Sequence, residues 1–251
     1  MFLRKLFIPL TLILVMLAAC NNGPAPEEQI YEHLEEAVSL EEEFREQQEP
    51  IVELERKEQE LYNKIINLSM DEFDQIQEYS QEAASLVEER QEKIDREKES
   101  IDAAKEEFDK IEPIIDDLDE EEQEEAKEEA QKLVETMNNR YEAYQQLYQS
   151  YQSAIELDKE LYELLQQEDL EEETLQNQID KINDSYDKVI EANEEFNQYT
   201  EQYNEQKKTF YEATDLNVEY SEQENGASES ESNEQEKEDN PDSEEEDTDQ
   251  E

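Results

Sequence analysis

The sequence predicts an all-α protein: an elongated four-helix, up-and-down antiparallel bundle with coiled-coil-like packing, followed by a disordered acidic C-terminal tail. Two observations lead to this prediction. Apolar residues recur at every seventh position over most of the chain, which is the period of packed amphipathic helices. The chain of 251 residues has only two glycines, Gly23 and Gly226, towards its two ends. The lack of glycine between them excludes phosphate-cradling loops and argues against a β-rich fold with many turns.

Four amphipathic segments make up the expected bundle domain, residues 28–215. In each segment, two rows of apolar residues form the edges of one stripe. The first two segments carry the rows Ile30, Ala37, Phe44, Ile51 and Ile65 with Leu40, Leu54, Leu61 and Leu68, and Phe73, Val87, Ile94, Ile101, Phe108 and Ile115 with Ile76, Ala83, Ala104, Ile111 and Leu118. The last two carry Ala130, Met137, Tyr144, Tyr151 and Leu165 with Leu133, Leu147, Ala154 and Leu161, and Leu175, Ile182, Val189, Phe196, Tyr203 and Phe210 with Ile179, Tyr186, Ala192 and Tyr199. The seven-residue period predicts a left-handed supercoil.

Turns are expected at three places between the segments. Ser69 followed by Glu72 is typical of a capping box, which starts a helix. Residues 116–125 are a strongly acidic interruption of the apolar pattern, and Asp169 followed by Glu172 again predicts a helix start. Short turns between long helices require neighbouring helices to run antiparallel.

Pro50 and Pro113 lie inside two of the predicted helices. Proline lacks an amide hydrogen and its ring clashes with the preceding turn, so it bends or ends a helix. Because the heptad phase is the same on both sides of each proline, the sequence predicts kinks at these positions rather than helix ends.

The N-terminus has the pattern of a bacterial lipoprotein signal peptide. A basic start is followed by a short apolar run, too short to cross a bilayer as a permanent helix. The run ends in Leu17-Ala18-Ala19-Cys20, which matches the lipobox. We therefore expect residues 1–19 to be a signal peptide that is cleaved between Ala19 and Cys20. The alternatives are an ordinary signal peptide with a chance cysteine and a weak membrane helix.

Cys20 is the only cysteine and the expected lipidation site. Its thiol would take a diacylglycerol group with palmitate-like acyl chains, and residues 20–27 would form the lipidated cysteine and a short tether. The expected location is the extracytoplasmic face of the bacterial cell membrane. More than one lipid chain is needed for durable attachment.

The charge balance is extreme, with 77 acidic and 21 basic residues. Loss of Arg4 and Lys5 with the signal peptide would change the net charge from −56 to −58. Such a surface repels nucleic acid and anionic lipid headgroups, so no nucleic-acid partner is expected. Residues 216–251 are the expected disordered tail, because residues 219–251 hold 16 acidic residues and one lysine and too little apolar surface to offset chain entropy.

No residue is predicted to be catalytic, metal-binding or cofactor-binding, and we do not expect an enzyme. His33, the only histidine, lies on the apolar stripe of the first segment and is expected at the edge of the core. The residue three positions before it is Ile30, so the Glu-x-x-His pattern of di-iron bundles is absent there. Carboxylate pairs can be chosen anywhere in so acidic a chain, and a narrow bundle offers little concavity for a substrate.

Tyrosines and carboxylates suggest two weaker possibilities. Six of the thirteen tyrosines lie at helical spacing and are expected in or beside the core with hydroxyls reaching solvent: Tyr144, Tyr148, Tyr151, Tyr186, Tyr199 and Tyr203. The alternative is a tyrosine-lined groove that stacks on sugars or holds a partner. The acidic tail is expected to be a solvated brush, or else a diffuse, low-affinity binder of Ca²⁺ or Mg²⁺.

A lipobox, a short tether and Glu/Gln-rich long helices with the phrase Tyr31-Glu32-His33-Leu34-Glu35-Glu36-Ala37 resemble the cell-wall binding lipoproteins of Gram-positive bacteria, the YkyA-like family. The resemblance covers roughly residues 1–213 and excludes the tail. It implies a four-helix up-and-down bundle on the outer face of the cytoplasmic membrane and no catalytic residues. Cys20 is the only functional residue that it carries over.

The first functional hypothesis is a membrane-anchored, non-enzymatic envelope lipoprotein with a structural or binding role, including cell-wall binding. Its partners would be membrane lipid through acylated Cys20, and peptidoglycan or an envelope protein. The alternatives are a self-assembling helical adaptor, which leaves a homo-oligomer open, and a low-affinity divalent-cation or solute-binding lipoprotein. No cofactor is expected under any of these hypotheses.

Overall fold

The computed structural model describes residues 23–119, 123–214, 216 and 218, so the expected signal peptide, Cys20 and nearly all of the expected tail lie outside the described residues. The described part is helical and contains no strand, which confirms the predicted fold class. The helices are α1 (Pro26–Leu40), α2 (Glu42–Ile65), α3 (Phe73–Phe108), α4 (Glu112–Ile115), α5 (Glu124–Leu164) and α6 (Glu172–Ala213), with 3₁₀ turns at Met70–Glu72 and Asp109–Ile111. They all belong to one compact unit, Met1–Asn217.

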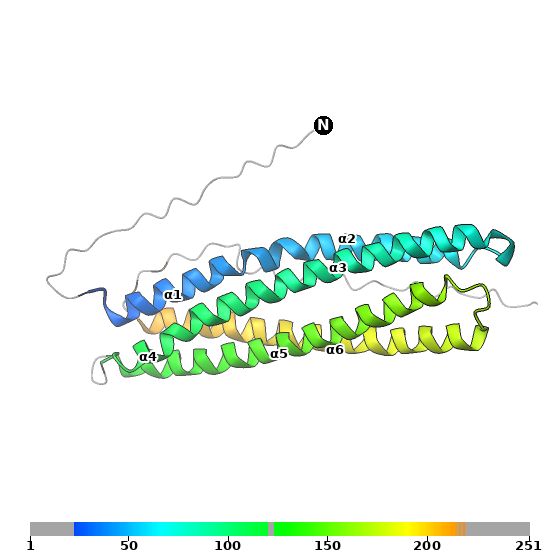
Figure 1. Ribbon diagram of the computed structural model, residues 1–251. Helices are drawn as coiled ribbons and strands as arrows, with labels where there is room; N and C mark the ends of the chain where they lie inside the picture. The colour runs from blue at the N-terminus through cyan, green and yellow to red at the C-terminus, as the bar shows by residue number, and fades with distance from the viewer. Residues whose placement is uncertain (1–22, 120–122, 215, 217, 219–251) are drawn as a thin grey trace, which may run out of the picture. The chain divides into compact units, whose positions relative to one another are not determined.

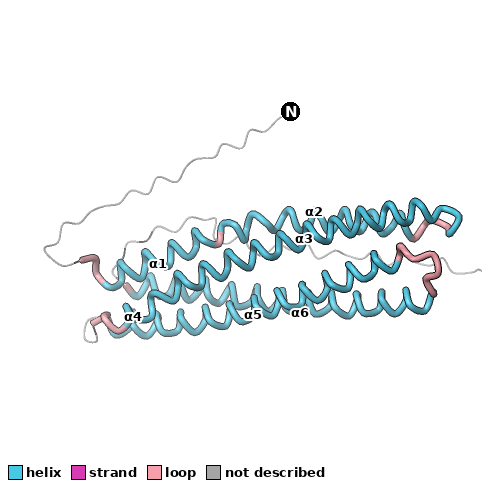
Figure 2. The backbone as a smooth tube through the Cα atoms, viewed as in Figure 1, coloured by secondary structure: helices cyan, strands magenta, loops and turns pink. Residues whose placement is uncertain are grey.

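The helices form four rods arranged as two antiparallel hairpins. The first rod is α1 followed by α2, the second is α3 continued by α4, and α5 and α6 are the third and fourth (Figure 1). α2 packs along α3 and α5 packs along α6, while α3 joins the two hairpins by packing against α5. The turns between the rods are short, as the tube through the backbone shows (Figure 2).

Side-chain contacts establish the direction of each pair. His33, near the start of α1, meets Glu107, near the end of α3. Gln77, near the start of α3, donates to the carbonyl of Gln166, just beyond the end of α5. Gln178, near the start of α6, contacts Glu160, near the end of α5. Each pair joins the beginning of one rod to the end of its neighbour, so the predicted up-and-down topology is correct.

The core is built from the predicted apolar rows, and aromatic rings fill its middle. Phe44 from α2, Tyr144 from α5 and Phe196 from α6 form a triangle with ring centroids 5.3–5.9 Å apart. Ile101 from α3 packs in the same cluster. Tilted and edge-to-face ring pairs add about 0.5–1.5 kcal/mol each beyond burial of their area. All four rods therefore meet in this cluster.

The helix starts agree with the sequence at one turn and differ at two other positions. The Ser69 amide donates to the Glu72 carboxylate at 3.2 Å, as predicted for a capping box. α1 begins at Pro26, two residues before the expected domain start, because proline's fixed φ suits the first position of a helix. The cap of α6 is Glu171 rather than the predicted Asp169. Leu170 packs against the core in this turn, which delays the helix start.

The first rod is interrupted at Glu41, where the heptad pattern predicted no break. In an unbroken helix the Phe44 amide would donate to the Leu40 carbonyl. Here the Ser100 hydroxyl of α3 lies between them: it donates to the Leu40 carbonyl at 2.6 Å and accepts from the Phe44 amide at 3.1 Å. A side chain inserted into the helical ladder is a recognised cause of helix distortion.

The two prolines behave differently. Pro50 lies inside α2, which continues on both sides of it, as predicted. At Pro113 the prediction of a simple kink is wrong, because α3 ends at Phe108 and a 3₁₀ turn precedes the short helix α4. Pro113 has no amide hydrogen for the Asp109 carbonyl, and its ring crowds the preceding turn. The chain tightens there into the 3₁₀ form.

Replacing Ser100 by alanine is expected to destabilise the fold by about 1–3 kcal/mol, because the Leu40 carbonyl and the Phe44 amide lose their common partner inside the bundle. Urea unfolding followed by circular dichroism measures this change. The matched control is Ser85→Ala on the exposed side of the same helix, expected to stay within about 0.5 kcal/mol. Equal midpoints for the two variants would contradict this account of the break.

Candidate functional site

The predicted lipidation and cleavage residues cannot be placed, because Ala19 and Cys20 lie outside the described residues. His33 lies at the edge of the core with its side chain 30% exposed. Its Nδ1 is 2.7 Å from Glu107 Oε1. Lys110, with His33 as a second partner, lowers the pKa of Glu107. This surface ion pair resembles no ligand set, and no group of three or more metal-binding side chains occurs in the described ranges.

Polar side chains occupy the places where the predicted apolar rows are interrupted. Seven such places fall inside the helices, and every one holds a buried polar residue: Gln47, Glu58, Ser80, Arg90, Glu97, Arg140 and Asp158. Burying a charge is costly unless it is paired. The two arginines therefore organise two polar layers, which we call the Arg90 layer and the Arg140 layer.

The Arg90 layer joins all four rods. Arg90 is 1% exposed, and its Nη1 lies 3.0 Å from Glu58 Oε2 and 4.0 Å from Glu55 Oε1, both on α2. Its Nη2 donates to Asp158 Oδ2 on α5. The same oxygen accepts from the Tyr186 hydroxyl of α6 at 2.7 Å, and the guanidinium lies 5.9 Å from the centroid of that tyrosine ring.

Burial and charge act in opposite directions within this layer. Burial raises the pKa of Glu58 to about 7, although Arg90 opposes the shift. Burial alone would lower the pKa of Arg90, but Tyr186, Glu58 and Asp158 outweigh it, so the pKa is raised and the guanidinium stays charged. Burial also raises the pKa of Tyr186, which keeps its hydroxyl protonated as a donor.

The Arg140 layer lies at the break between α1 and α2. Arg140 is 4% exposed and binds the Glu41 carboxylate through both terminal nitrogens, at 2.6 and 2.8 Å. Its Nε donates to the Thr200 hydroxyl of α6 at 3.0 Å. The guanidinium also lies 5.2 Å from the ring centroid of Phe196 and 5.5 Å from that of Tyr203. Bidentate pairing of this kind has a fixed geometry, so it orients α5 against the break.

Glu97 is a third buried ionisable side chain and has no cationic partner in the described residues. It is 7% exposed and accepts a hydrogen bond from Gln48. Burial raises the pKa of Glu97 to about 8, against the effect of the Gln48 hydrogen bond. A carboxyl in this state is largely protonated at neutral pH.

Perturbed carboxyl groups are a common property of catalytic sites, but these are enclosed between helices. Glu58, Glu97 and Asp158 are each at most 7% exposed, so a substrate has no approach to them in this structure. The arrangement is suited to a structural task. A shifted helix register would leave a buried guanidinium unpaired, at a cost of about 3–5 kcal/mol.

The hydroxyls of Tyr144, Tyr151 and Tyr186 lie inside the bundle, which corrects for these three the expectation that the hydroxyls reach solvent. Tyr148 donates to Asp95 at 2.9 Å, and Tyr151 donates to Glu55. Tyr144 is almost completely buried, and burial raises its pKa beyond the usual range. Because the rings and hydroxyls are used between helices, no tyrosine lines the surface groove described next.

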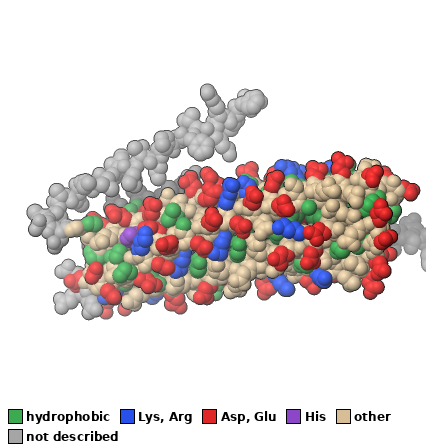
Figure 3. All heavy atoms as spheres, viewed as in Figure 1, with side chains coloured by type: hydrophobic (Ala, Val, Ile, Leu, Met, Phe, Trp, Pro, Cys, Tyr) green, Lys and Arg blue, Asp and Glu red, His purple; other side chains and the backbone are tan. Residues whose placement is uncertain are grey.

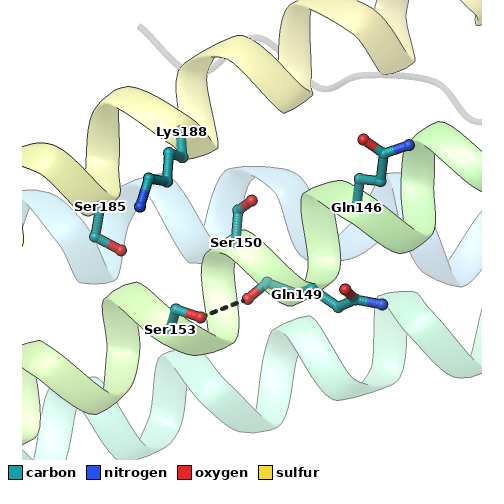
Figure 4. Close-up of a pocket in the computed structure, with 6 residues that line it drawn as sticks. All are labelled: Gln146, Gln149, Ser150, Ser153, Ser185 and Lys188. Atoms are coloured by element: carbon teal, nitrogen blue, oxygen red, sulfur yellow. Dashed lines mark hydrogen bonds between the residues drawn. The ribbon is translucent and has the colours of Figure 1, made fainter.

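A shallow polar groove lies between α5 and α6 (Figure 4). Its volume is about 310 Å³, and it is lined by Gln146, Gln149, Ser150, Ser153, Ser185 and Lys188. In Figure 4 the Lys188 side chain extends from α6 into the space beside Ser150 and Ser185. The Ser153 hydroxyl donates to the Gln149 carbonyl at 3.0 Å.

The groove differs in charge from the rest of the surface. Acidic side chains are spread along the face seen in Figure 3, with basic ones among them. The groove lining contains no carboxylate. It coincides with residues 143–155, a run of thirteen without charge in a chain of which 39% is charged. Among the helices that the structure describes, none is long and apolar enough to span a membrane.

The sequence contains signals for both the buried polar layers and the surface groove, although composition and spacing alone did not identify them as sites. The interruptions of the heptad rows marked the buried polar layers, and the uncharged run marked one wall of the groove. The rows could not show which polar residues pair, because the partners lie 32 to 99 positions apart, as for Arg90 with Glu58 and Arg140 with Glu41.

Comparison with known proteins gives one family and one similar fold. The YkyA family model, described as "Putative cell-wall binding lipoprotein", matches residues 25–213. No curated protein matches the chain. A crystal structure of a conserved protein of unknown function from Staphylococcus aureus is similar with a TM-score of 0.63 and 15% identity, covering 74% of this chain and 93% of that chain. At this identity the similarity shows the fold alone.

Replacing Glu97 by glutamine is expected to raise stability at high pH. The folded-state pKa of about 8 exceeds the ordinary glutamate value of 4.5, so the contribution of Glu97 is fully present below about pH 4.5 and is lost as the pH rises through 8. Glutamine keeps the acceptor for Gln48 and cannot ionise. We expect about 1–3 kcal/mol of added stability at pH 9 and little change at pH 5.

Melting curves at both pH values measure the effect, with Glu99→Gln on the exposed side of α3 as the control. Both variants remove one negative charge from the same helix, so a difference between them reports burial. If the two variants change the melting temperature equally at pH 9, Glu97 does not ionise inside the bundle.

Proposed function

Because the chain belongs to the YkyA family, described as "Putative cell-wall binding lipoprotein", we propose that it is a lipid-anchored, non-enzymatic binding protein of the bacterial cell envelope. In this proposal, acylated Cys20 holds the protein to the extracytoplasmic face of the cell membrane, and the bundle contacts the cell wall. The observation on which the proposal rests is the family match, which spans residues 25–213 and so covers all six described α-helices completely.

Membrane attachment is supported by the order of features along the chain. The lipobox cysteine lies five residues before the family match begins. In the proposed layout, residues 1–19 are removed, a short tether follows Cys20, the helices form the binding domain, and residues 216–251 form an acidic tail. The thiol of Cys20 is the nucleophile that takes the diacylglycerol group.

A binding role rather than catalysis is supported by where the unusual carboxyl groups lie. General acid or base chemistry requires a group within hydrogen-bond reach of a bound substrate. Glu58 and Glu97, which have the raised pKa values, are enclosed between helices and bonded to the bundle itself. The exposed groove carries hydroxyl, amide and ammonium groups, which bind but do not form a nucleophile–base pair.

Self-assembly is less well supported than binding to another partner. The large apolar side chains exposed in the described residues are Val52, Ile66, Met70 and Ile190. Stable homodimers require extended apolar surfaces, and these four are few in number and interspersed with polar residues. Analytical ultracentrifugation separates the two cases, because the adaptor alternative requires a dimer at micromolar concentration.

The anchoring proposal predicts that Cys20→Ser abolishes lipid attachment. Serine has no thiol, so the full chain expressed in a Gram-positive host should incorporate no radiolabelled palmitate and should stay uncleaved after Ala19. The measurement is labelling together with intact mass. Ser85→Ala is the control, expected to be labelled as the unchanged chain is. Because the chain has no other cysteine, undiminished labelling of Cys20→Ser would refute thiol lipidation.

Wall binding predicts that the full chain, purified in detergent, sediments with purified peptidoglycan. The net charge of −56 opposes contact with anionic wall polymers, so the measurement is made with Mg²⁺ and with a chelator. Sedimentation in either condition supports the proposal. Absence of sedimentation in both would favour an envelope protein as the partner.

A further inference from the structure

The groove between α5 and α6 has the chemistry of a carbohydrate site. Two serine hydroxyls and two glutamine amides can each donate and accept hydrogen bonds, which suits the hydroxyls and acetamido groups of sugars. The Ser153 hydroxyl already donates to the Gln149 carbonyl and can still accept. Its volume of about 310 Å³ is at the lower end of the about 300–1,000 Å³ usual for small-molecule sites. The groove is therefore large enough for a short carbohydrate segment.

Lys188 adds a positive charge at the mouth of the groove. Several other lysines of the bundle pair with a carboxylate on their own helix, for example Lys98 with Asp102 and Lys132 with Glu129. Lys188 forms no ion pair within residues 23–119 and 123–214, although acidic side chains lie one turn away on α6. Its ammonium group is free to meet an anion.

The floor of the groove is preorganised. Ser185 is 6% exposed and belongs to α6, which packs along α5 over its whole length. The next residue on α6, Tyr186, belongs to the Arg90 layer, where it and Asp158 join the same two helices. Rigid support of this kind lowers the entropy cost of binding.

We propose that this groove binds an anionic carbohydrate, with Lys188 holding its negative group and Ser150 and Gln149 contacting its hydroxyls. This inference rests on the proposed wall-binding function and assigns it a site. It also resolves a conflict of charge: a chain with 77 acidic residues can contact an anionic polymer where the lining has no carboxylate and one free ammonium group.

The anion can come from two wall sources, the carboxylate of a peptidoglycan muropeptide or the phosphate of a polyol-phosphate polymer. The test is co-sedimentation of the full chain, purified in detergent, with peptidoglycan stripped of the phosphate polymer and with peptidoglycan that retains it. Each arm is repeated with Mg²⁺ and with a chelator. Binding to stripped peptidoglycan assigns the carboxylate, and binding only to the unstripped material assigns the phosphate.

Three variants test the site itself. Lys188→Glu is expected to weaken binding about five- to ten-fold or more, because it replaces attraction by repulsion, while Lys188→Arg keeps the charge and most of the affinity. Ser150→Gln fills the groove without changing charge and should also weaken binding. Lys181→Glu is the matched control, an exposed lysine seven positions earlier on α6 and outside the groove. Melting temperatures establish that each variant is folded.

The outcomes separate this inference from the proposed function. If the unchanged chain binds and neither Lys188→Glu nor Ser150→Gln alters binding, wall binding stands and the groove is excluded as its site. Equal weakening by Lys181→Glu and Lys188→Glu would show a non-specific charge effect and overturn the site. If binding is lost with the chelator but is unchanged by Lys188→Glu, the contact with the wall is made through bridging cations and not through the groove. If the unchanged chain binds neither material, both the proposed wall binding and the site are wrong.

Discussion

Arg90 and Arg140 are buried in the middle of a bundle that is only four rods wide, so each guanidinium must find its counter-charges on the surrounding helices. Arg90 forms ion pairs with Glu58 and Asp158, which lie on two other rods. Arg140 forms an ion pair with Glu41, at the break in the first rod. If one helix slid by a heptad along its neighbours, its apolar rows would still meet apolar rows. The same shift would leave a buried charge without its partner, which is costly. The two layers therefore fix the register on which the core and the surface groove depend.

The same constraint explains the irregular places of the fold. Glu41 can reach Arg140 where the helix is interrupted, and the Ser100 hydroxyl satisfies the backbone groups that the interruption releases. The rods are otherwise held by apolar and aromatic contacts, because the exposed ion pairs along single helices contribute little. The acid-rich exterior is compatible with a core that contains ion pairs, because the exterior carboxylates are in water and the buried ion pairs are shielded from it.

Much of the fold could be predicted from the sequence, but little of the candidate site could. The heptad rows led to four antiparallel rods, and Ser69 with Glu72 located a turn correctly. Asp169 was wrong as a cap because packing of Leu170 outweighed the local signal, and Pro113 was accompanied by a 3₁₀ turn. The hydroxyls of Tyr144, Tyr151 and Tyr186 were misplaced for a similar reason, since a helical pattern gives the face of a residue and not the direction of its polar end.

By itself the sequence determined the helical class, the number of rods and the family, because these follow from period, composition and contiguous motifs. Only the tertiary structure decided which polar residues pair, where the first rod breaks, and that Lys188 stands beside an uncharged stretch of α5. The physical reason is distance along the chain. Periodicity is set by neighbours within two helical turns, whereas Arg140 meets a carboxylate 99 positions away, and no local pattern encodes that choice.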